Sequence, residues 1–221
     1  MSAANGKGSA IQFPPVTTLA TLGLRAHSGW AAVVALCGPT SAPRVLARQR
    51  LEFADAKLAY SKQPYHAAAE RPLGEAEKLI ATCMQSSIEL AFRGLRDIMS
   101  VAPSQPAACG LLLGSGRPLP DLAGILRSHA LIHTAEGEMF RSVLSQAAER
   151  LGWRVIGVKE KLIWQQAPTA LNQSAAAVAA QLKAMGKSLG PPWREDERLA
   201  TLAAWMALAQ SAPRAAFSKE H

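Results

Sequence analysis

Residues 19–53 read LATLGLRAHSGWAAVVALCGPTSAPRVLARQRLEF. They divide into three extended stretches, 19–25, 29–37 and 44–53, separated by the turn at 26–28 and by the Gly/Pro-rich loop at 38–43. Extended segments joined by short turn sequences favour antiparallel pairing of neighbours. This part of the chain therefore predicts an antiparallel meander of three strands.

Helical periodicity follows the meander after a loop of about twenty residues, a length typical of functional or mobile segments. Between Pro72 and Pro103, apolar residues recur at steps of three and four, which predicts a helix packed on the core. The residues with this spacing are Ala76, Leu79, Ile80, Cys83, Met84, Ile88, Ala91, Leu95 and Ile98.

The second half of the chain alternates strands and helices. Residues 107–113 and 154–158 are short apolar runs typical of buried strands, and 128–151 between them predicts a long helix with Gly152 as its C-cap. A strand, helix and strand in this length imply a right-handed crossover and parallel pairing. An alanine-rich helix is expected over 169–185, stopping at Gly186, and a last helix over 195–210.

Composition and length indicate one α/β domain. The chain has 221 residues, of which 49% are hydrophobic and 18% charged, so it has enough apolar surface to fold. We expect a single domain over 18–211, a disordered tail over 1–17 and a second tail over 212–221. The longest apolar run, 30–37, is far shorter than the roughly 18 residues of a membrane span.

The N-terminus and the cysteines favour a reducing cytoplasm. Residues 1–9 lack the apolar region of a secretory signal. Cys37, Cys83 and Cys109 are odd in number and lie on apolar runs without disulfide or metal spacing, so we expect three core thiols.

The positive charge is concentrated in two separate segments. The formal net charge is +8, and residues 1–60 and 151–193 each contribute +4 of it, with 6 basic against 2 acidic and 5 against 1. If these segments meet in space, they form a basic face suited to nucleic acid or another polyanion. Basic proteins are also common for solubility alone, and the sequence gives no indication of oligomeric state.

The order of elements resembles the ribonuclease H-like fold, and three stretches resemble RuvC-type Holliday-junction resolvases in particular. LGLRAHS at 22–28 is similar to the first strand and turn of that family. SHALIHTAEG at 128–137, continuing through AAERLGWRV at 147–155, is similar to the helix after the fourth strand and the return to a strand. REDERLATLA at 194–203 is similar to the final helix, and the resemblance covers roughly 19–210.

The resemblance implies a two-metal nuclease, but the sequence departs from it at the metal ligands. Two Mg²⁺ ions need a cluster of carboxylates. Arg25, which cannot bind a metal, stands where the family has its first-strand Asp. The fourth strand, which should supply a Glu, ends in 113–116, LGSG. Only the acidic run 195–197 remains, in which Glu197 best matches the final carboxylate, and this run also suits a helix N-terminus.

Two other groups of residues are candidates for different chemistry. If strands one and four are neighbours, their ends bring together side chains suited to a phosphate or carboxylate ligand. This predicted anion site consists of Arg25, His27, Ser28, Ser115 and Arg117.

The second group predicts a divalent metal. His129, His133 and Glu136 lie on one face of the expected helix, where an i, i+4 histidine pair with a third ligand can bind Zn²⁺. Glu197 is a further candidate ligand, and His66 could complete a site from the loop. The alternative is that both helix histidines are satisfied by local hydrogen bonds and have no ligand. Trp193 is either a platform for a base or a cap over the last helix.

The sequence thus favours a RuvC-like domain that has lost its nuclease centre and binds nucleic acid or a phosphorylated partner. A second hypothesis is a metal-dependent hydrolase that uses His27, His66, His129, His133 and Glu136. A third is a protein–protein adaptor whose basic segments bind an acidic partner.

Overall fold

The computed structural model describes residues 19–100 and 106–211. The predicted tails over 1–17 and 212–221 lie outside these residues. In the described part of the chain no helix is both long enough and apolar enough to cross a membrane. In chain order the elements are β1 (Ala20–His27), β2 (Trp30–Cys37), β3 (Arg44–Glu52), α1 (Pro64–Ala68), α2 (Leu73–Met99), β4 (Pro106–Leu113), α3 (Leu122–Leu126), α4 (His129–Arg150), β5 (Arg154–Lys159), the 3₁₀ helix η1 (Glu160–Leu162), α5 (Ile163–Leu171), α6 (Ala175–Leu189) and α7 (Glu195–Ser211).

The five strands form one mixed sheet in the order β3-β2-β1-β4-β5. The predicted meander is confirmed, since β1 pairs antiparallel with β2 and β2 antiparallel with β3. The predicted parallel pairing is also confirmed, because β4 lies between β1 and β5 and runs parallel to both. The carboxyl ends of β1, β4 and β5 therefore meet at one edge of the sheet.

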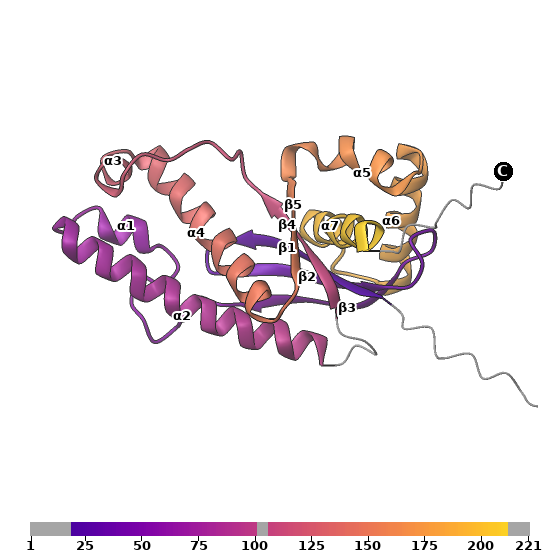
Figure 1. Cartoon of the computed structure of the whole chain (residues 1–221), viewed down its shortest axis with the longest axis horizontal. Helices are drawn as coiled ribbons and strands as arrows, with labels where there is room; N and C mark the ends of the chain where they lie inside the picture. The colour runs from indigo at the N-terminus through magenta and orange to yellow at the C-terminus, as the bar shows by residue number, and fades with distance from the viewer. Residues whose placement is uncertain (1–18, 101–105, 212–221) are drawn as a thin grey trace, which may run out of the picture.

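Helices cover both faces of this sheet (Figure 1). Side chains alternate along β1, so Leu22 and Leu24 enter the core under α2 and α4, while Thr21 faces α7 and donates to the carbonyl of Ala204. The opposite core contains α5, α6 and α7, with Trp205 fully buried at its centre. Arg25, two residues beyond Gly23, belongs to the α7 face by the same alternation.

The long helix and its neighbours follow the sequence closely. α2 begins directly after Pro72 and buries most of the residues whose spacing predicted it. At the end of α4, Gly152 has a φ of 78°, its N–H donates to Glu149 and that of Trp153 donates to Ala148, which is a Schellman motif. Cys37, Cys83 and Cys109 are buried free thiols, as expected, and burial beside the charge of Glu149 raises the pKa of Cys109 to about 12.

The predicted alanine-rich helix over 169–185 is wrong in its bounds, because the chain forms two helices there. Asn172, with a φ of 51°, ends α5 in the left-handed region, and the Ser174 side chain accepts from the backbone N–H of Ala177 to begin α6. Local capping at these two residues overrides the apolar periodicity. α6 also continues past Gly186, since that glycine makes room for the ring of Trp193 rather than ending the helix. Trp193 therefore packs on α6.

Two short helices were not predicted from the sequence. α1 lies inside the expected twenty-residue loop and begins with Pro64, whose fixed φ suits the first turn of a helix. α3 begins at the Asp121 side chain, which accepts from the Gly124 N–H at 2.8 Å. Helices of five residues are too short to give a periodic signal.

Gly23 and Gly110 allow α7 to lie directly on the central strands. A Cβ atom at Gly23 would collide with the backbone of Ala200, and one at Gly110 would collide with the backbone of Ala203. The helix and the sheet thus touch through their main chains, which larger residues at these two positions would prevent.

We predict that Gly23→Ala and Gly110→Ala each lower the free energy of unfolding by about 1–3 kcal/mol or more, because overpacking must move α7. Gly74→Ala is the matched control, since Gly74 is exposed in the first turn of α2 with nothing within 4 Å of its added Cβ. It should be neutral or stabilise by up to about 1 kcal/mol. Denaturant unfolding of the three variants tests this, and equal stability of all three would contradict the close approach.

Candidate functional site

The side chain of Arg25 is the centre of an ion-pair network at the end of β1. Its Nη2 and Nε donate to the two carboxylate oxygens of Glu160 at 2.7 and 3.3 Å, and its Nη1 pairs with Asp196. Glu160 follows β5 and Asp196 lies in the first turn of α7, so three distant segments converge here. The Arg25 side chain is 16% exposed.

The network changes the acidity of its members. Burial lowers the pKa of Arg25, but the hydrogen bond and charge of Glu160, followed by those of Asp196, outweigh burial and raise it overall. Burial raises the pKa of Asp196, but hydrogen bonds and charge from His27 and Arg25 together hold it below its usual range. Both groups are thus stabilised in their charged forms.

His27 extends the network toward the meander. Its Nε2 lies 2.8 Å from Oδ1 of Asp196, and its ring stacks on Trp30 with centroids 4.0 Å apart and 8° between the planes. The guanidinium carbon of Arg50 lies 3.6 Å from the centroid of the same indole. Because β2 lies between β1 and β3, Trp30 is held between His27 and Arg50.

A second tryptophan lies close to Glu160 in the sequence. Trp164, in the first turn of α5, is 41% exposed and lies 5.5 Å from the guanidinium carbon of Arg198 on α7. It follows Glu160 by four residues, and exposed Lys161 lies between them. We call the whole surface the Arg25 edge; it consists of Arg25, His27, Trp30, Arg50, Glu160, Lys161, Trp164, Asp196 and Arg198.

A groove of about 500 Å³ lies beside the Arg25 edge, over β2, β3 and the start of α7. Its lining includes three arginines, an indole ring and two carboxylates, which are Arg48, Arg50, Arg194, Trp30, Asp196 and Glu197. Arg48 is fixed by backbone carbonyls of the loop before α7, including that of Gly190 at 2.8 Å. The groove therefore presents three arginines beside an indole ring and two carboxylates, and Arg50 is itself paired with Glu52.

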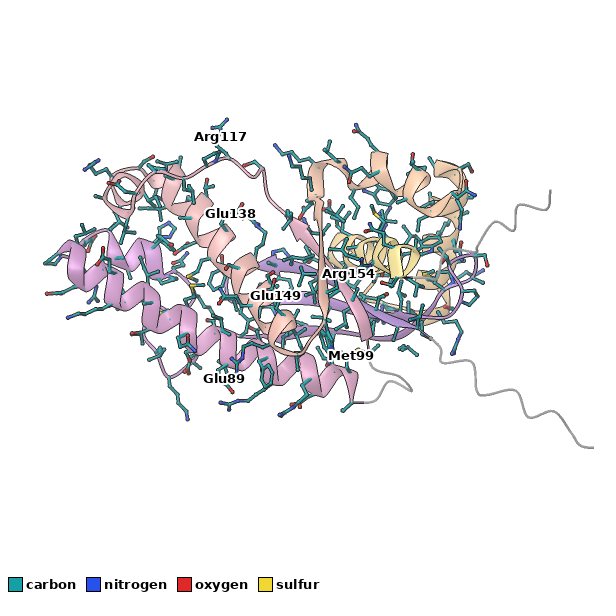
Figure 2. All side chains as sticks on the ribbon, in the orientation of Figure 1. Glu89, Met99, Arg117, Glu138, Glu149 and Arg154 are labelled. Atoms are coloured by element: carbon teal, nitrogen blue, oxygen red, sulfur yellow. The ribbon has the colours of Figure 1, made fainter. Side chains whose placement is uncertain are left out.

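The five residues of the predicted anion site are not brought together. Arg25 and His27 meet, but each binds Asp196, and Arg25 also binds Glu160. Ser28 is exposed in the β1–β2 turn. Ser115 and Arg117 lie on the exposed segment after β4, and Figure 2 shows Arg117 pointing away from the body of the protein.

The acidic run of α7 has divided roles. Asp196 pairs with Arg25, whereas Glu197 accepts a hydrogen bond from the backbone N–H of Arg194 at 2.7 Å and so caps its own helix. Glu197 lies on the α7 face of the sheet, and the candidate histidines lie on α1 and α4, which cover the other face. The structure therefore does not place Glu197 with them.

Gly114, in the stretch 113–116 where the family resemblance implies a glutamate, lies against a carboxylate from another element. A Cβ atom at Gly114 would come within 2.7 Å of Oε1 of Glu138 and 2.6 Å of Nη2 of Arg141, both on α4. Glu138 (Figure 2) is paired with Arg141 at 2.9 Å, so it too is neutralised by an arginine.

Three histidines of the described residues form a compact cluster between α1 and α4. His66, His129 and His133 offer ring nitrogens that all lie within 4.8 Å of one another. Their ring centroids are 4.5–5.4 Å apart. His27 is not part of this cluster, because it is bound at the Arg25 edge.

Glu136 lies behind the histidine cluster, with its side chain 5% exposed. Its Oε2 lies 2.9 Å from Nδ1 of His66, and its Oε1 accepts from the backbone N–H groups of Tyr65 at 3.1 Å and His66 at 3.3 Å. The structure therefore places His66 with His129 and His133, whereas Glu136 contacts His66 rather than the two helix histidines.

Sequence reasoning missed Glu160, Trp164 and Arg198 as parts of a site. For Glu160 and Trp164 the sequence signal is a basic and aromatic stretch after the last predicted strand, KEKLIW at 159–164, and Arg198 lies in the charged run REDER at 194–198. Nothing local indicates that this stretch meets the turn that follows β1.

Comparison with solved structures confirms the predicted resemblance. No protein-family model and no curated protein matches the sequence. The fold is similar to that of T. thermophilus RuvC in complex with a Holliday junction substrate, with a TM-score of 0.50 and 11% identity over 87% of this chain and 94% of that one. A second Thermus thermophilus RuvC structure has a TM-score of 0.46 and 13% identity over 87% and 95%. The chain thus has a RuvC-like, ribonuclease H-like fold.

Proposed function

We propose that this protein is a RuvC-like domain that binds nucleic acid at the Arg25 edge without a two-metal nuclease centre. One observation carries the proposal: the exposed indole of Trp164 lies beside Arg198 and follows Glu160 of the Arg25 network by four residues. Trp30 is covered by His27 and Arg50, so it holds Arg50 at the same surface rather than offering a free face. Indole rings stack on bases with little sequence preference, and guanidinium groups bind phosphates.

The distribution of charge supports this surface. The two segments that hold the basic excess, 1–60 and 151–193, meet where Glu160 binds Arg25 and where Gly190 binds Arg48. Arg50 from the first segment and Lys161 from the second lie on the same edge as a result. A sequence-independent interaction with the phosphate backbone needs such a gathering of cations.

The ion pairs of Arg25 argue against metal-dependent cleavage. Two Mg²⁺ ions need unpaired anionic oxygens, and Asp196 and Glu160 already share the guanidinium of Arg25. The arginine thus supplies internally the positive charge that metal ions supply in a two-metal nuclease. The similar RuvC structure is bound to a Holliday junction, so a four-way junction belongs among the nucleic acids to test.

Binding of fluorescein-labelled single strands, duplexes and four-way junctions should weaken steeply with salt. With about four phosphate contacts, log K should fall against log[salt] with a slope of about −3.6 on duplex. Lys161→Ala should reduce this slope by about one unit. Trp164→Ala should weaken binding to single strands about 5- to 150-fold with little change of slope, because stacking releases no counterions. Fluorescence anisotropy from about 50 mM salt upward measures both quantities.

The matched control for Trp164 is Tyr60→Ala. Tyr60 is also exposed and lies beside an arginine, Arg71, but it precedes α1, away from the Arg25 edge. This variant should bind like the wild type. Absence of binding to all three nucleic acids at about 50 mM salt would refute the proposal and favour a protein–protein adaptor.

Replacing the arginine by a carboxylate tests whether Arg25 substitutes for metal ions. In Arg25→Asp three carboxylates would face one another, so Mg²⁺ at about ten times its Kd should raise the melting temperature by about 3–6 °C. The wild type should show no such rise in melting temperature. The charge-reversal control Lys183→Asp, at an exposed position of α6, should show none either. A similar Mg²⁺ effect on the wild type would contradict the assigned role of Arg25.

The wild-type protein should not cleave a four-way junction or an RNA–DNA hybrid in the presence of Mg²⁺, because its carboxylates are neutralised by arginine. Gel analysis beside an active two-metal resolvase checks this. Cleavage that disappears in Asp196→Asn would show that the nuclease centre is functional.

A further inference from the structure

We propose that His66, His129 and His133 bind one divalent transition-metal ion, with Zn²⁺ as the preferred candidate, and that Glu136 orients His66 without binding the ion. This site is independent of the proposed nucleic-acid interface. It lies on α1 and α4, whereas the Arg25 edge faces α7.

The arrangement of the ring nitrogens fits a three-histidine site. Four-coordinate zinc holds imidazole nitrogens at 2.0–2.1 Å, which places them about 3.4 Å apart. The three donors already lie within 4.8 Å of one another, so small rotations of the side chains would bring them to this distance. Within residues 19–100 and 106–211 the rings of His129 and His133 have no hydrogen-bond partner, so the expected local hydrogen bonds are absent.

Glu136 prepares His66 for metal binding. An ionised carboxylate only accepts hydrogen bonds, so the 2.9 Å contact places a proton on Nδ1 of His66. The lone pair of its other nitrogen, Nε2, is then available for a cation. A carboxylate behind a ligating histidine is the usual arrangement in zinc sites, where it fixes the tautomer and strengthens the ligand.

The scaffold holds the three histidines without using a flexible loop. His129 and His133 lie one turn apart at the start of α4. His66 lies on α1, whose backbone N–H groups at Tyr65 and His66 are tied to Glu136 on α4. One buried carboxylate on α4 thus fixes α1, and with it His66, beside the two histidines of α4.

The ligand set determines the class of ion. Imidazoles suit zinc, copper, nickel or iron, whereas Mg²⁺ and Ca²⁺ prefer oxygen ligands. His129 and His133 are exposed, so a bound ion would reach solvent and keep a fourth position for water or an anionic ligand. An open position is typical of zinc ions that act as Lewis acids.

The test uses the full-length chain with any affinity tag removed, since tag histidines bind metal themselves. The protein is dialysed against Zn²⁺ at about two equivalents per chain and then passed through a desalting column. The wild type should retain about one zinc per chain, measured by elemental mass spectrometry. His66→Ala and His133→Ala should lose it. Glu136→Gln should weaken affinity about 10- to 100-fold in zinc titration calorimetry. Co²⁺ should give the visible absorption bands of a four-coordinate site.

His27→Ala and Glu197→Gln are the controls, because these residues lie at the α7 face, and both should retain one zinc. Circular dichroism of each variant separates loss of the site from loss of the fold. Zinc-free wild type, or zinc retained by His133→Ala, would overturn the proposal. Neither outcome bears on nucleic-acid binding, which the salt titration measures separately.

Discussion

The backbone of α7 lies in direct contact with the two central strands of the sheet, because Gly23 and Gly110 have no side chains to hold it away. This contact fixes the height of the helix above the sheet and the position of its first turn at the carboxyl end of β1. Asp196 can therefore reach both Arg25 and His27. Arg198 and one wall of the groove beside β3 depend on this approach too, since they lie on the same helix and its preceding loop.

At the end of β1, the positive charge of Arg25 neutralises two carboxylates, Glu160 and Asp196. Two carboxylates near each other repel unless a cation lies between them. In a two-metal nuclease, bound metal ions supply the positive charge between the carboxylates. A guanidinium is covalently attached and permanently charged, so it stabilises the pair of carboxylates in every state of the protein. The result is a partly buried ion-pair network beside the half-buried ring of Trp30.

The two sites lie in different parts of the molecule: the Arg25 edge on the α7 face of the sheet, and the histidine cluster between α1 and the start of α4. On the α7 face, charges from three segments are neutralised in pairs; Arg50 is paired with Glu52, whereas Arg198 lies beside the ring of Trp164. On the face covered by α2 and α4, one buried carboxylate, Glu136, holds α1 against α4 and leaves three imidazoles beside one another. Both sites are built from side chains on regular elements, which position them more accurately than a loop would.

Local sequence alone determined the elements and much of their order. The meander, α2, α4 with its Schellman end and β5 all follow from periodicity, turns and caps, which act over a few residues. Apolar periodicity does not reveal the helix end at Asn172 or the short helices α1 and α3. Their local signals are the left-handed Asn172, Pro64 at the start of α1 and the Asp121 cap of α3. The helix face that carries His129, His133 and Glu136 was predictable because spacing on a helix is a local property.

Which partners these side chains meet was decided by the tertiary structure. Arg25 binds Glu160, 135 residues away, and Asp196, 171 residues away, and neither separation leaves a periodic trace in the sequence. The same holds for His66 and Glu136, which are 70 residues apart. Charge counting identified two basic segments but not the contact between them. Such pairings depend on how the sheet orders its strands and how closely a helix can approach it, and these are properties of the packed chain rather than of any one segment.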